Sequence, residues 1–135
     1  GIQPKAAFLS HSNFGSSSTP SATKVREATA MFMERYPDIE ADGEMHADAA
    51  LDEKVRLDLL PESKLTGSAN LLICPNLDSA NIARNLLKVL GKGVTVGPVL
   101  LGLEKEAHVA TASNSPRGIF NMAAVALANV NRGDD

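Results

Sequence analysis

The sequence holds a single cysteine, Cys74, and this scarcity excludes two kinds of site. A disulfide within the chain needs two cysteines and a multi-cysteine zinc site needs several, so neither forms here. A lone thiol fits a reducing compartment, and we expect a cytoplasmic protein. We interpret Cys74, which ends an apolar run, as a buried structural residue, because a reactive thiolate requires nearby positive charge.

The sequence also lacks a basic excess and long apolar runs. Its 16 acidic residues outnumber its 13 basic ones, for a net charge of −3, whereas a duplex nucleic-acid binder normally carries a basic surplus. No apolar run approaches the roughly 20 residues of a membrane span. We therefore expect neither nucleic acid nor a membrane as partner. The chain begins at Gly1, without an initiator methionine or a signal peptide, and we expect it to be a piece of a longer protein.

The composition that remains is that of an ordinary globular domain, with 44% hydrophobic and 21% charged residues among 135. Continuous apolar runs predict buried strands. Such runs occur at Lys5–Ser10 and Ala69–Cys74. We expect further strands over Ile39–Gly43, over Val94–Leu103 with a bend at Gly97-Pro98, and over Ala107–Thr111.

Helical spacing and capping residues predict the helices between these strands. We expect one from Thr19-Pro20 to Pro37, with Val25, Ala28, Thr29, Phe32 and Tyr36 on its buried face. The others are expected over Ala47–Leu60 (Ala50, Leu51, Val55, Leu59 and Leu60 inward), Asp78–Leu90 (Ile82, Leu86 and Leu90 buried) and Ile119–Val130 (buried on several sides), before a frayed tail at Asn131–Asp135. The alternation predicts an α/β fold with a mostly parallel sheet covered on both faces. Breaks at Gly97-Pro98 and Gly102 leave open a separate lobe for the last part.

The loop Ser10–Ser18 (SHSNFGSSS) follows the first strand and leads into a helix N-terminus. Backbone N–H groups, hydroxyls and the helix dipole suit an anion such as phosphate there. The loop is neither a P-loop nor a dinucleotide fingerprint, because the required lysine and glycines are missing. A strand-to-helix turn needs small residues in any case, so a purely structural role stays equally open. His11 between Ser10 and Ser12 does not indicate a hydrolase, because adjacent side chains rarely face each other as a catalytic pair.

Two further polar stretches come into question as sites. Asp42, Glu44, His46 and Asp48 lie within seven residues and are of ligand type for a divalent cation, but polar strand ends and helix caps explain them better, and we expect no metal. His108 precedes the polar stretch Thr111–Ser115; it either contacts a ligand or satisfies a backbone carbonyl.

Ordered segments of the chain resemble the phosphate acetyltransferase (phosphotransacetylase) family. They are FLSHSNFGS (Phe8–Ser16), DGEMHADAA (Asp42–Ala50), PNLDSANI (Pro75–Ile82), GPVLLG (Gly97–Gly102) and IFNMAAVA (Ile119–Ala126). The match covers nearly the whole chain but only the C-terminal part of that family's module. It is closer still to the phosphotransacetylase-like region of bacterial NADP-dependent malic enzymes. The resemblance implies a three-layer α/β/α fold like that of isopropylmalate dehydrogenases, with a cleft between two lobes.

The resemblance also implies that transferase activity is lost. Active members carry Ser-Arg-Gly after the last short strand and an Asp before the terminal helix. Aligned on Ile119 and Asn121, these fall on Thr111, Ala112 and Ser113, and the Asp falls on Gly118. An alternative frame sets Ser115-Pro116-Arg117-Gly118 against Ser-Arg-Gly, but Pro116 is better explained as a helix-start residue. In either frame Arg117 stays near the cleft, where a guanidinium suits a CoA phosphate.

The resemblance therefore predicts a non-catalytic regulatory and oligomerisation domain that binds acetyl-CoA, the alternative being an active phosphate acetyltransferase. NADP, a divalent metal and malate oxidation would belong to N-terminal domains of the same chain, and none of these cofactors to this piece. The expected ligand-binding residues are Ser12, Asn13, Gly15, Ser16, His108, Thr111, Ala112, Ser113 and Arg117. An apolar surface of Ile82, Leu86, Leu87 and Leu90 predicts an isologous contact in a homo-oligomer.

Overall fold

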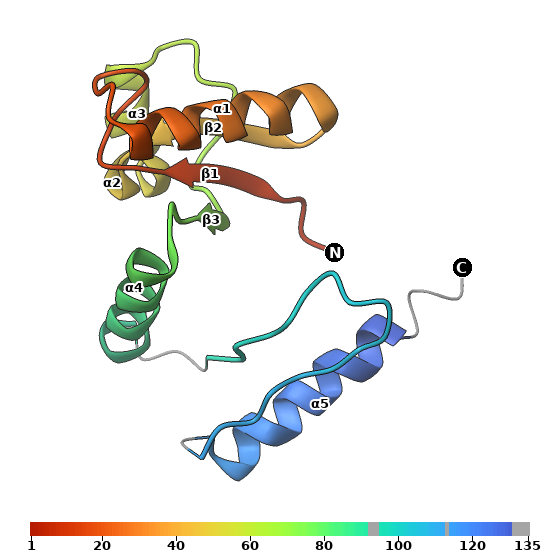
Figure 1. Ribbon diagram of the computed structural model, residues 1–135. Helices are drawn as coiled ribbons and strands as arrows, with labels where there is room; N and C mark the ends of the chain where they lie inside the picture. Colours follow the sequence, from red (N-terminus) through yellow and green to blue (C-terminus); the bar gives the residue numbers. More distant parts are fainter. Residues whose placement is uncertain (92–94, 113, 131–135) are drawn as a thin grey trace. The chain divides into compact units, whose positions relative to one another are not determined.

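The computed structural model describes residues 1–91, 95–112 and 114–130. Along these ranges the order is β1 (Lys5–Leu9), α1 (Pro20–Arg35), β2 (Glu40–Met45), α2 (Ala47–Leu51), α3 (Glu53–Leu59), β3 (Leu71–Ile73), α4 (Leu77–Leu90) and α5 (Pro116–Val130), as Figure 1 shows. The chain divides into two compact units, Gly1–Ala83 and Arg84–Asp135. None of the helices in the described ranges is long and apolar enough to cross a membrane.

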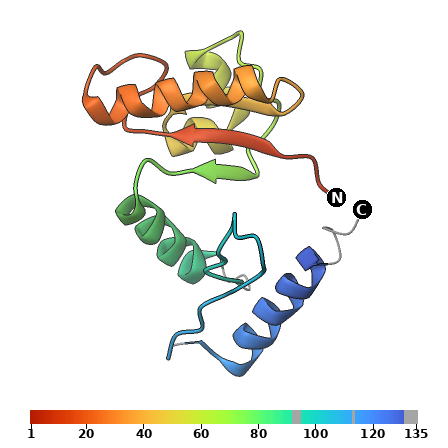
Figure 2. The same ribbon diagram turned by 45° about the vertical axis from the view of Figure 1, so that its right-hand side comes forward.

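The first unit is built on a parallel sheet in the order β2-β1-β3. Ala7 of β1 lies opposite Asp42 of β2 on one side and Leu72 of β3 on the other. Figure 2 shows β3 alongside β1. Parallel neighbours need crossover connections, which the helices provide. The prediction of a parallel α/β fold is confirmed.

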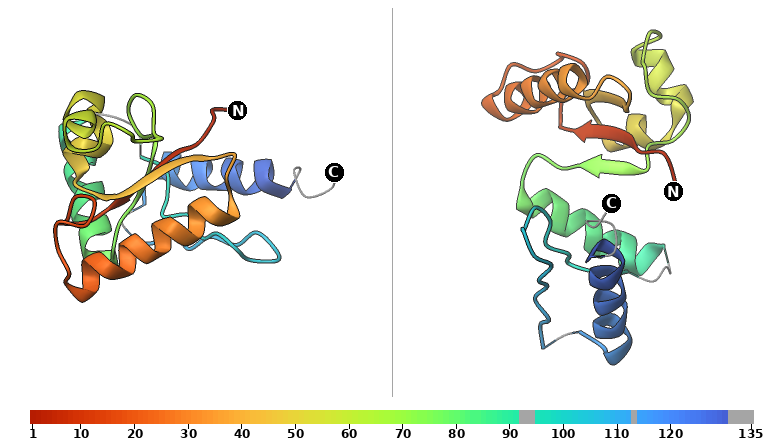
Figure 3. Two further views of the ribbon diagram at one scale, coloured as in Figure 1. Left: turned by 90° about the horizontal axis from the view of Figure 1, so that it is seen from above. Right: turned by 90° about the vertical axis from the view of Figure 1, so that its right-hand side faces the viewer.

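Successive residues of β1 face opposite sides of the sheet, so the first unit has two apolar cores. Ala6 and Phe8 pack with Val25 of α1, while Ala7 and Leu9 pack with the opposite layer. That second core also contains Met45, Ala49, Ala50, Leu65 and Ala69, with Cys74 partly buried against it. Figure 3 shows α1 and the α2–α3 pair on opposite sides of the strands. The first unit is thus a three-layer α/β/α arrangement, as predicted.

Helix α1 forms where its capping residues predicted it. The Thr19 hydroxyl caps the first turn, Pro20 is the first helical residue, and the helix ends before Pro37. Its buried residues are Ala22, Val25 and Thr29, whereas Ala28 is exposed and Tyr36 is 45% exposed. The expectation for Ala28 and Tyr36 was wrong, because the packed stripe starts one turn earlier, at Ala22.

The helix expected over Ala47–Leu60 is two helices, α2 and α3. Asp52 leaves the helical conformation, and its carboxylate accepts hydrogen bonds from the backbone N–H groups of Lys54 and Val55. Asp52 is therefore the N-cap of a new helix rather than a mid-helix residue. The change of axis leaves Leu51 and Leu59 about half exposed instead of inward.

A fully buried arginine, Arg56, ties α3 to the rest of the first unit. Its guanidinium donates to the carbonyl oxygens of Ala49 at 2.9 Å, Leu65 at 3.0 Å and Gly67 at 2.7 Å. Hydrogen bonding is what allows a charged side chain to be buried. The segment after α3 is consequently held by polar contacts as well as by Leu65.

The remaining strand boundaries differ moderately from expectation. β2 runs over Glu40–Met45 rather than Ile39–Gly43, and β3 is shorter than Ala69–Cys74. Leu71 and Ile73 of β3 are 42% and 37% exposed, not buried. The strand pairs on one side only, with β1, so it is an edge strand in the described sheet.

In the second unit the strands expected over Val94–Leu103 and Ala107–Thr111 are not present within residues 95–112; Val94 itself lies outside the described residues. A strand exists only where a neighbouring strand pairs with its backbone, and the described part of this unit offers none. The segment is attached to α4 by a hydrogen bond from Arg84 to the Gly97 carbonyl at 3.1 Å.

The two helices that contribute to the second unit are more exposed than expected. α4 has no buried residue, so the predicted stripe of Ile82, Leu86 and Leu90 is not covered. α5 begins at Pro116 rather than Ile119, and Ile119, Phe120 and Leu127 are 49%, 71% and 66% exposed while Met122 is buried. Burial on several sides was therefore wrong for the described chain, because few of its residues pack against these helices. The tail Asn131–Asp135 lies outside the described residues.

Candidate functional site

The serine-rich loop between β1 and α1 is organised by one carboxylate, that of Glu44 at the end of β2. Its Oε1 accepts hydrogen bonds from the Ser12 hydroxyl at 2.7 Å and the Gly15 backbone N–H at 2.9 Å. The Glu44 carbonyl also accepts from the Phe14 N–H at 2.7 Å. Glu44 is completely buried. The loop therefore folds around a side chain from the neighbouring strand.

Arg26 of α1 completes this network. Its Nε and Nη2 donate to the two oxygens of Glu44 at 3.0 and 2.8 Å, and Nη2 also donates to the Ser17 carbonyl at 2.7 Å. Burial alone raises the pKa of Glu44, but the hydrogen bonds from Arg26, Ser12 and Gly15 outweigh it and lower that pKa to about 2. Glu44 in turn raises the pKa of Arg26. The pair is ionised and leaves the loop without a net charge from these two residues.

The tip of the loop has an unusual backbone. Phe14 has a φ of +46° and Gly15 a φ of +91°. Only glycine adopts positive φ without steric cost, and a phenylalanine there is held by its surroundings. Phe14 packs against the core that contains Leu9 and Met45. The tip is thus anchored from inside by an aromatic side chain.

The four loop residues expected to bind a ligand have different roles. Ser12 is fully buried and bonded to Glu44, so its hydroxyl shapes the loop. The Asn13 side chain accepts from the His46 N–H at 2.7 Å. Gly15 and Ser16 are exposed in the loop that leads into α1. Of these four residues, Gly15 and Ser16 are therefore the ones exposed to a ligand.

Two histidines take part in this region, His11 within the loop and His46 directly after β2. His46 Nε2 donates to the His11 carbonyl at 2.9 Å. The His11 ring nitrogen Nε2 lies 3.1 Å from the Thr19 hydroxyl and 3.3 Å from that of Ser17. Sequence reasoning missed the roles of Glu44, Arg26 and His46 in this loop. The signal available was the cluster Asp42–Asp48, which was interpreted as a strand end with helix caps, or as a metal site, but not as part of this loop.

The polar cluster around β2 does not converge on a single point. Asp42 accepts from Ser63 at 2.6 Å and from the Lys64 N–H at 3.2 Å, whereas Glu44 is bonded to Arg26. Within the described ranges no three His, Cys, Asp or Glu residues are placed to hold a metal ion. The residues described fit neither a divalent metal nor, lacking the glycine fingerprint, a dinucleotide.

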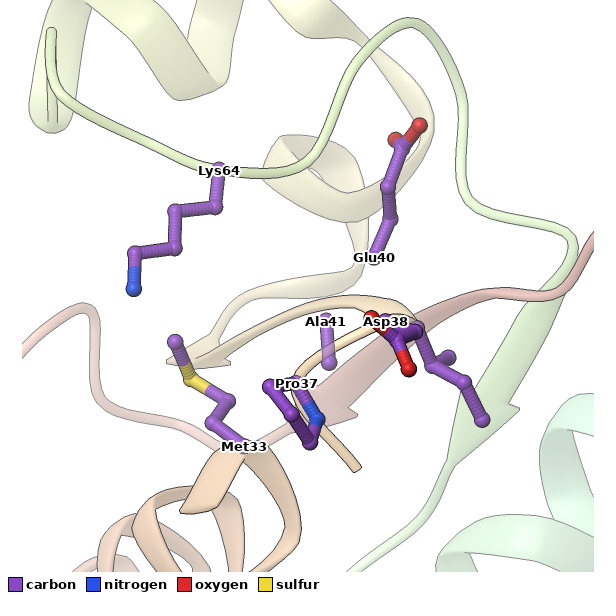
Figure 4. Close-up of a pocket in the computed structure, with 7 residues that line it drawn as sticks. Met33, Pro37, Asp38, Glu40, Ala41 and Lys64 are labelled. Carbon is purple, nitrogen blue, oxygen red and sulfur yellow. The ribbon is translucent and has the colours of Figure 1, made fainter. Parts of the chain in front are cut away.

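A hollow of about 200 Å³ lies elsewhere on the first unit, where α1 ends and β2 begins. Figure 4 shows Lys64 on one side of it and Met33 and Pro37 on the other, with the Glu40 carboxylate turned away. Hydrogen bonds from Thr66 lower the pKa of Glu40 and occupy it. In open α/β sheets ligands bind at the carboxyl ends of the strands, so the loop after β1 is the better candidate site.

The other expected ligand residues belong to the second unit. Thr111 is bonded to Asn114 through its N–H and its hydroxyl, at 2.9 and 2.5 Å, and Ala112 is exposed. Arg117 is exposed in the first turn of α5, which Ser115 caps through a 3.1 Å bond from the Gly118 N–H. The side chain of His108 is largely buried, and Ser113 lies outside the described residues.

The apolar residues expected to form an oligomer contact all lie exposed on α4. Ile82, Leu86, Leu87 and Leu90 are 61%, 56%, 58% and 75% exposed. Val89 on the same helix is 74% exposed. Exposed apolar surface of this extent on one helix is typical of an interaction face.

Comparisons with known proteins agree on one family. Residues 1–127 match the family described as phosphate acetyl/butaryl transferase. The chain is 54% identical over 128 residues to the NADP-dependent malic enzyme of Escherichia coli (strain K12), covering 94% of this chain and 17% of that protein, at its C-terminal part. It is 40% identical over 123 residues to the phosphate acetyltransferase of Paracoccus denitrificans, covering 91% of this chain and 39% of that one.

Solved structures show the same fold. A phosphotransacetylase from Streptococcus pyogenes superposes with a TM-score of 0.90 at 35% identity, over 97% of this chain and 40% of that one. The EutD phosphotransacetylase from Staphylococcus aureus gives 0.85 at 33%, over 95% and 40%. The chain thus spans about a sixth of the malic enzyme and two fifths of the transferases that it matches.

Proposed function

The chain belongs to the phosphate acetyl/butaryl transferase family, and we propose that it is the non-catalytic, acetyl-CoA-binding regulatory part of an NADP-dependent malic enzyme. The higher identity to a malic enzyme than to a phosphate acetyltransferase, 54% against 40%, supports this choice. Oxidative decarboxylation of malate to pyruvate, with NADP and a divalent metal, then takes place in cytoplasmic domains outside this chain.

The proposal that the chain is non-catalytic rests on two side-chain types that are missing near the expected active site, a carboxylate base and an aligned cation. Residues 107–118 (AHVATASNSPRG) contain no aspartate or glutamate, and Arg117 is the one arginine or lysine among them. Transfer of an acetyl group to CoA requires a base that removes the thiol proton and a cation that stabilises the phosphoryl charge. The aligned positions, Gly118 and Ala112, offer neither group.

Ligand binding does not need those groups. The exposed Gly15 and Ser16 lie in the loop that leads into α1, and the dipole at the start of that helix favours a phosphate. The ion pair of Arg26 and Glu44 holds this loop in place without a ligand, which reduces the entropy cost of binding. Arg117, exposed on α5, supplies a cation for a CoA phosphate. Losing a base and a cation weakens transition-state stabilisation far more than ground-state binding.

Regulation follows from linkage. If acetyl-CoA binds two quaternary arrangements with unequal affinity, it shifts their populations by that difference. The exposed apolar residues of α4 supply a surface for a subunit contact that differs between the two arrangements. The chain therefore combines a ligand site with an assembly surface.

A second candidate function is an active phosphate acetyltransferase, favoured by the 40% identity to the Paracoccus denitrificans enzyme. Calorimetric titration of acetyl-CoA into the full-length protein and its Arg117→Ala variant, with a transferase assay on the same preparations, separates the two. Binding without turnover, weakened by Arg117→Ala, supports the regulatory function. Turnover of acetyl-CoA and phosphate favours the transferase, and the absence of both binding and turnover contradicts both.

A further inference from the structure

A pocket of different chemistry lies within the second unit, between the segment 107–111 and α5. Its volume is about 260 Å³, and its lining residues are His108, Ala110, Ile119, Met122, Ala123 and Ala126. Pockets that hold a whole drug-sized ligand measure about 300–1,000 Å³. This pocket is therefore suited to one end of a ligand rather than to a complete cofactor.

His108 is the only polar residue among those lining residues, and it has no hydrogen-bond partner within the part of the chain that the structure describes. Its side chain is 7% exposed, and neither ring nitrogen has a partner among the described residues. The nearest carboxylate, that of Glu106, lies 3.6 Å from Nε2, which is too long for a hydrogen bond. Buried polar atoms are almost always satisfied, by protein, water or ligand. A ligand atom facing His108 would meet this requirement.

The surroundings restrict the ligand to a neutral one. Five of the six lining residues are alanine, isoleucine or methionine, and an anion would lose its hydration there without compensation. The Glu106 carboxylate near the ring repels phosphate or carboxylate further. A purine is a poor fit as well, because no aromatic ring lines the pocket and one imidazole cannot pair with its several polar edge atoms.

What fits is a short alkyl chain that carries one carbonyl group. We propose that this pocket binds the acyl end of an acyl thioester, with the carbonyl oxygen accepting a hydrogen bond from the His108 ring N–H and the alkyl chain lying against Met122 and Ala123. The proposal rests on the proposed function, because bound acetyl-CoA is the source of the thioester. It adds that the protein recognises the acyl group itself and distinguishes acetyl-CoA from CoA.

Filling the pocket tests the alkyl contact. In the full-length protein, affinities for CoA, acetyl-CoA and butyryl-CoA are measured by calorimetry for Ala123→Leu and for the control Ala124→Leu, whose exposed site does not line the pocket. We expect Ala123→Leu to weaken butyryl-CoA binding about tenfold, as overpacking predicts, and to leave CoA binding unchanged. Ala124→Leu should change neither.

Removing the ring nitrogens tests the carbonyl contact. His108→Phe keeps a ring of similar size but has no N–H. We expect acetyl-CoA affinity to fall roughly three- to tenfold, the effect of one lost neutral hydrogen bond, while CoA affinity and the unfolding temperature do not fall. A merely structural histidine would lower the unfolding temperature and leave the ratio of acetyl-CoA to CoA affinity unchanged.

The opposite results overturn the proposal. Equal losses of affinity for CoA and for its esters would contradict it. A lower unfolding temperature of Ala123→Leu with an unchanged preference for acyl esters would also contradict it, because another part of the protein would then fill the pocket. If the unmodified protein binds no CoA ester, the proposed function fails.

Acyl binding in the pocket is then tested separately, with S-butyryl-N-acetylcysteamine at millimolar concentration. If this thioester raises the unfolding temperature of the unmodified protein and of Ala124→Leu, but not that of Ala123→Leu, the pocket binds the acyl group. If it raises none of them, the pocket proposal is contradicted.

Discussion

Arg26 of α1 contacts both carboxylate oxygens of Glu44 of β2, at 3.0 and 2.8 Å. The Arg26 side chain is 39% exposed, whereas that of Glu44 is fully buried. Glu44 in turn binds Ser12 and Gly15. The shape of the loop Ser10–Ser18 is therefore determined by two residues that lie outside it.

Glu44→Gln should destabilise the protein and loosen the loop. The amide keeps one acceptor but loses the charge that faces Arg26, and breaking a buried pair from one side costs about 3 kcal/mol. Urea unfolding measures the loss. Glu27→Gln on the exposed side of α1 is the control, and we expect it to change stability by less than about 0.5 kcal/mol. Equal effects of the two variants would contradict the role assigned to Glu44.

Acid should remove this stabilisation over a defined range. Glu44 has a pKa of about 2 in the folded protein, below its ordinary 4.5, so the unfolded chain takes up a proton first as the pH falls. The stability contributed by Glu44 is complete above about pH 5 and is lost progressively from there toward pH 2. Glu40, whose pKa is also lowered, adds to the loss. Unfolding free energies at several pH values should converge for the unmodified protein and Glu44→Gln as the pH drops; parallel curves would exclude the effect.

Gly43→Ala should be among the most damaging single-methyl changes. A Cβ at Gly43 would lie 2.7 Å from the Phe8 carbonyl oxygen and 2.9 Å from its Cβ, at a φ of +147°. Steric overlap in a core and positive φ together predict a loss of about 3 kcal/mol or more. Gly67→Ala is the matched control, with a φ of +63° and nothing within 4 Å, and should cost about 1 kcal/mol. Thermal unfolding compares the two, and a loss at Gly43 no larger than at Gly67 would contradict the packing.

Leu86→Lys should weaken assembly of the full-length protein. Leu86 lies among the exposed apolar residues of α4, and a buried ammonium at an interface is costly. Sedimentation velocity should show a shift to smaller species, whereas Lys88→Glu, a charge change on the same helix, serves as control. An unchanged distribution for Leu86→Lys would mean that this helix is not an interface between copies.

Local signals made part of the fold predictable. Thr19, Pro20 and Pro37 define α1 by chemistry that acts within a few residues, and apolar runs marked β1 and β3. Asp52 carried a capping signal that the surrounding helical spacing concealed. The strands expected after Gly91 are absent from residues 95–112. Their absence could not be predicted from the sequence, because a strand needs a neighbouring strand to pair with, and an apolar run does not show whether one is present. The loop itself could be identified, but not the Glu44–Arg26 pair, since those residues meet only after the sheet forms.

The position of β1 in the middle of the sheet has a consequence for biosynthesis. Both of its neighbours come later in the chain, and Ala6 and Phe8 pair with Leu71 and Ile73. During translation β1 leaves the ribosome with both edges unpaired. One edge can form hydrogen bonds only after β2 has emerged, and the other only after β3 has emerged. Contacts between residues so far apart in sequence slow folding. The apolar run from Ala6 to Leu9 is thus a candidate chaperone-binding segment of the nascent chain until Ile73 has emerged.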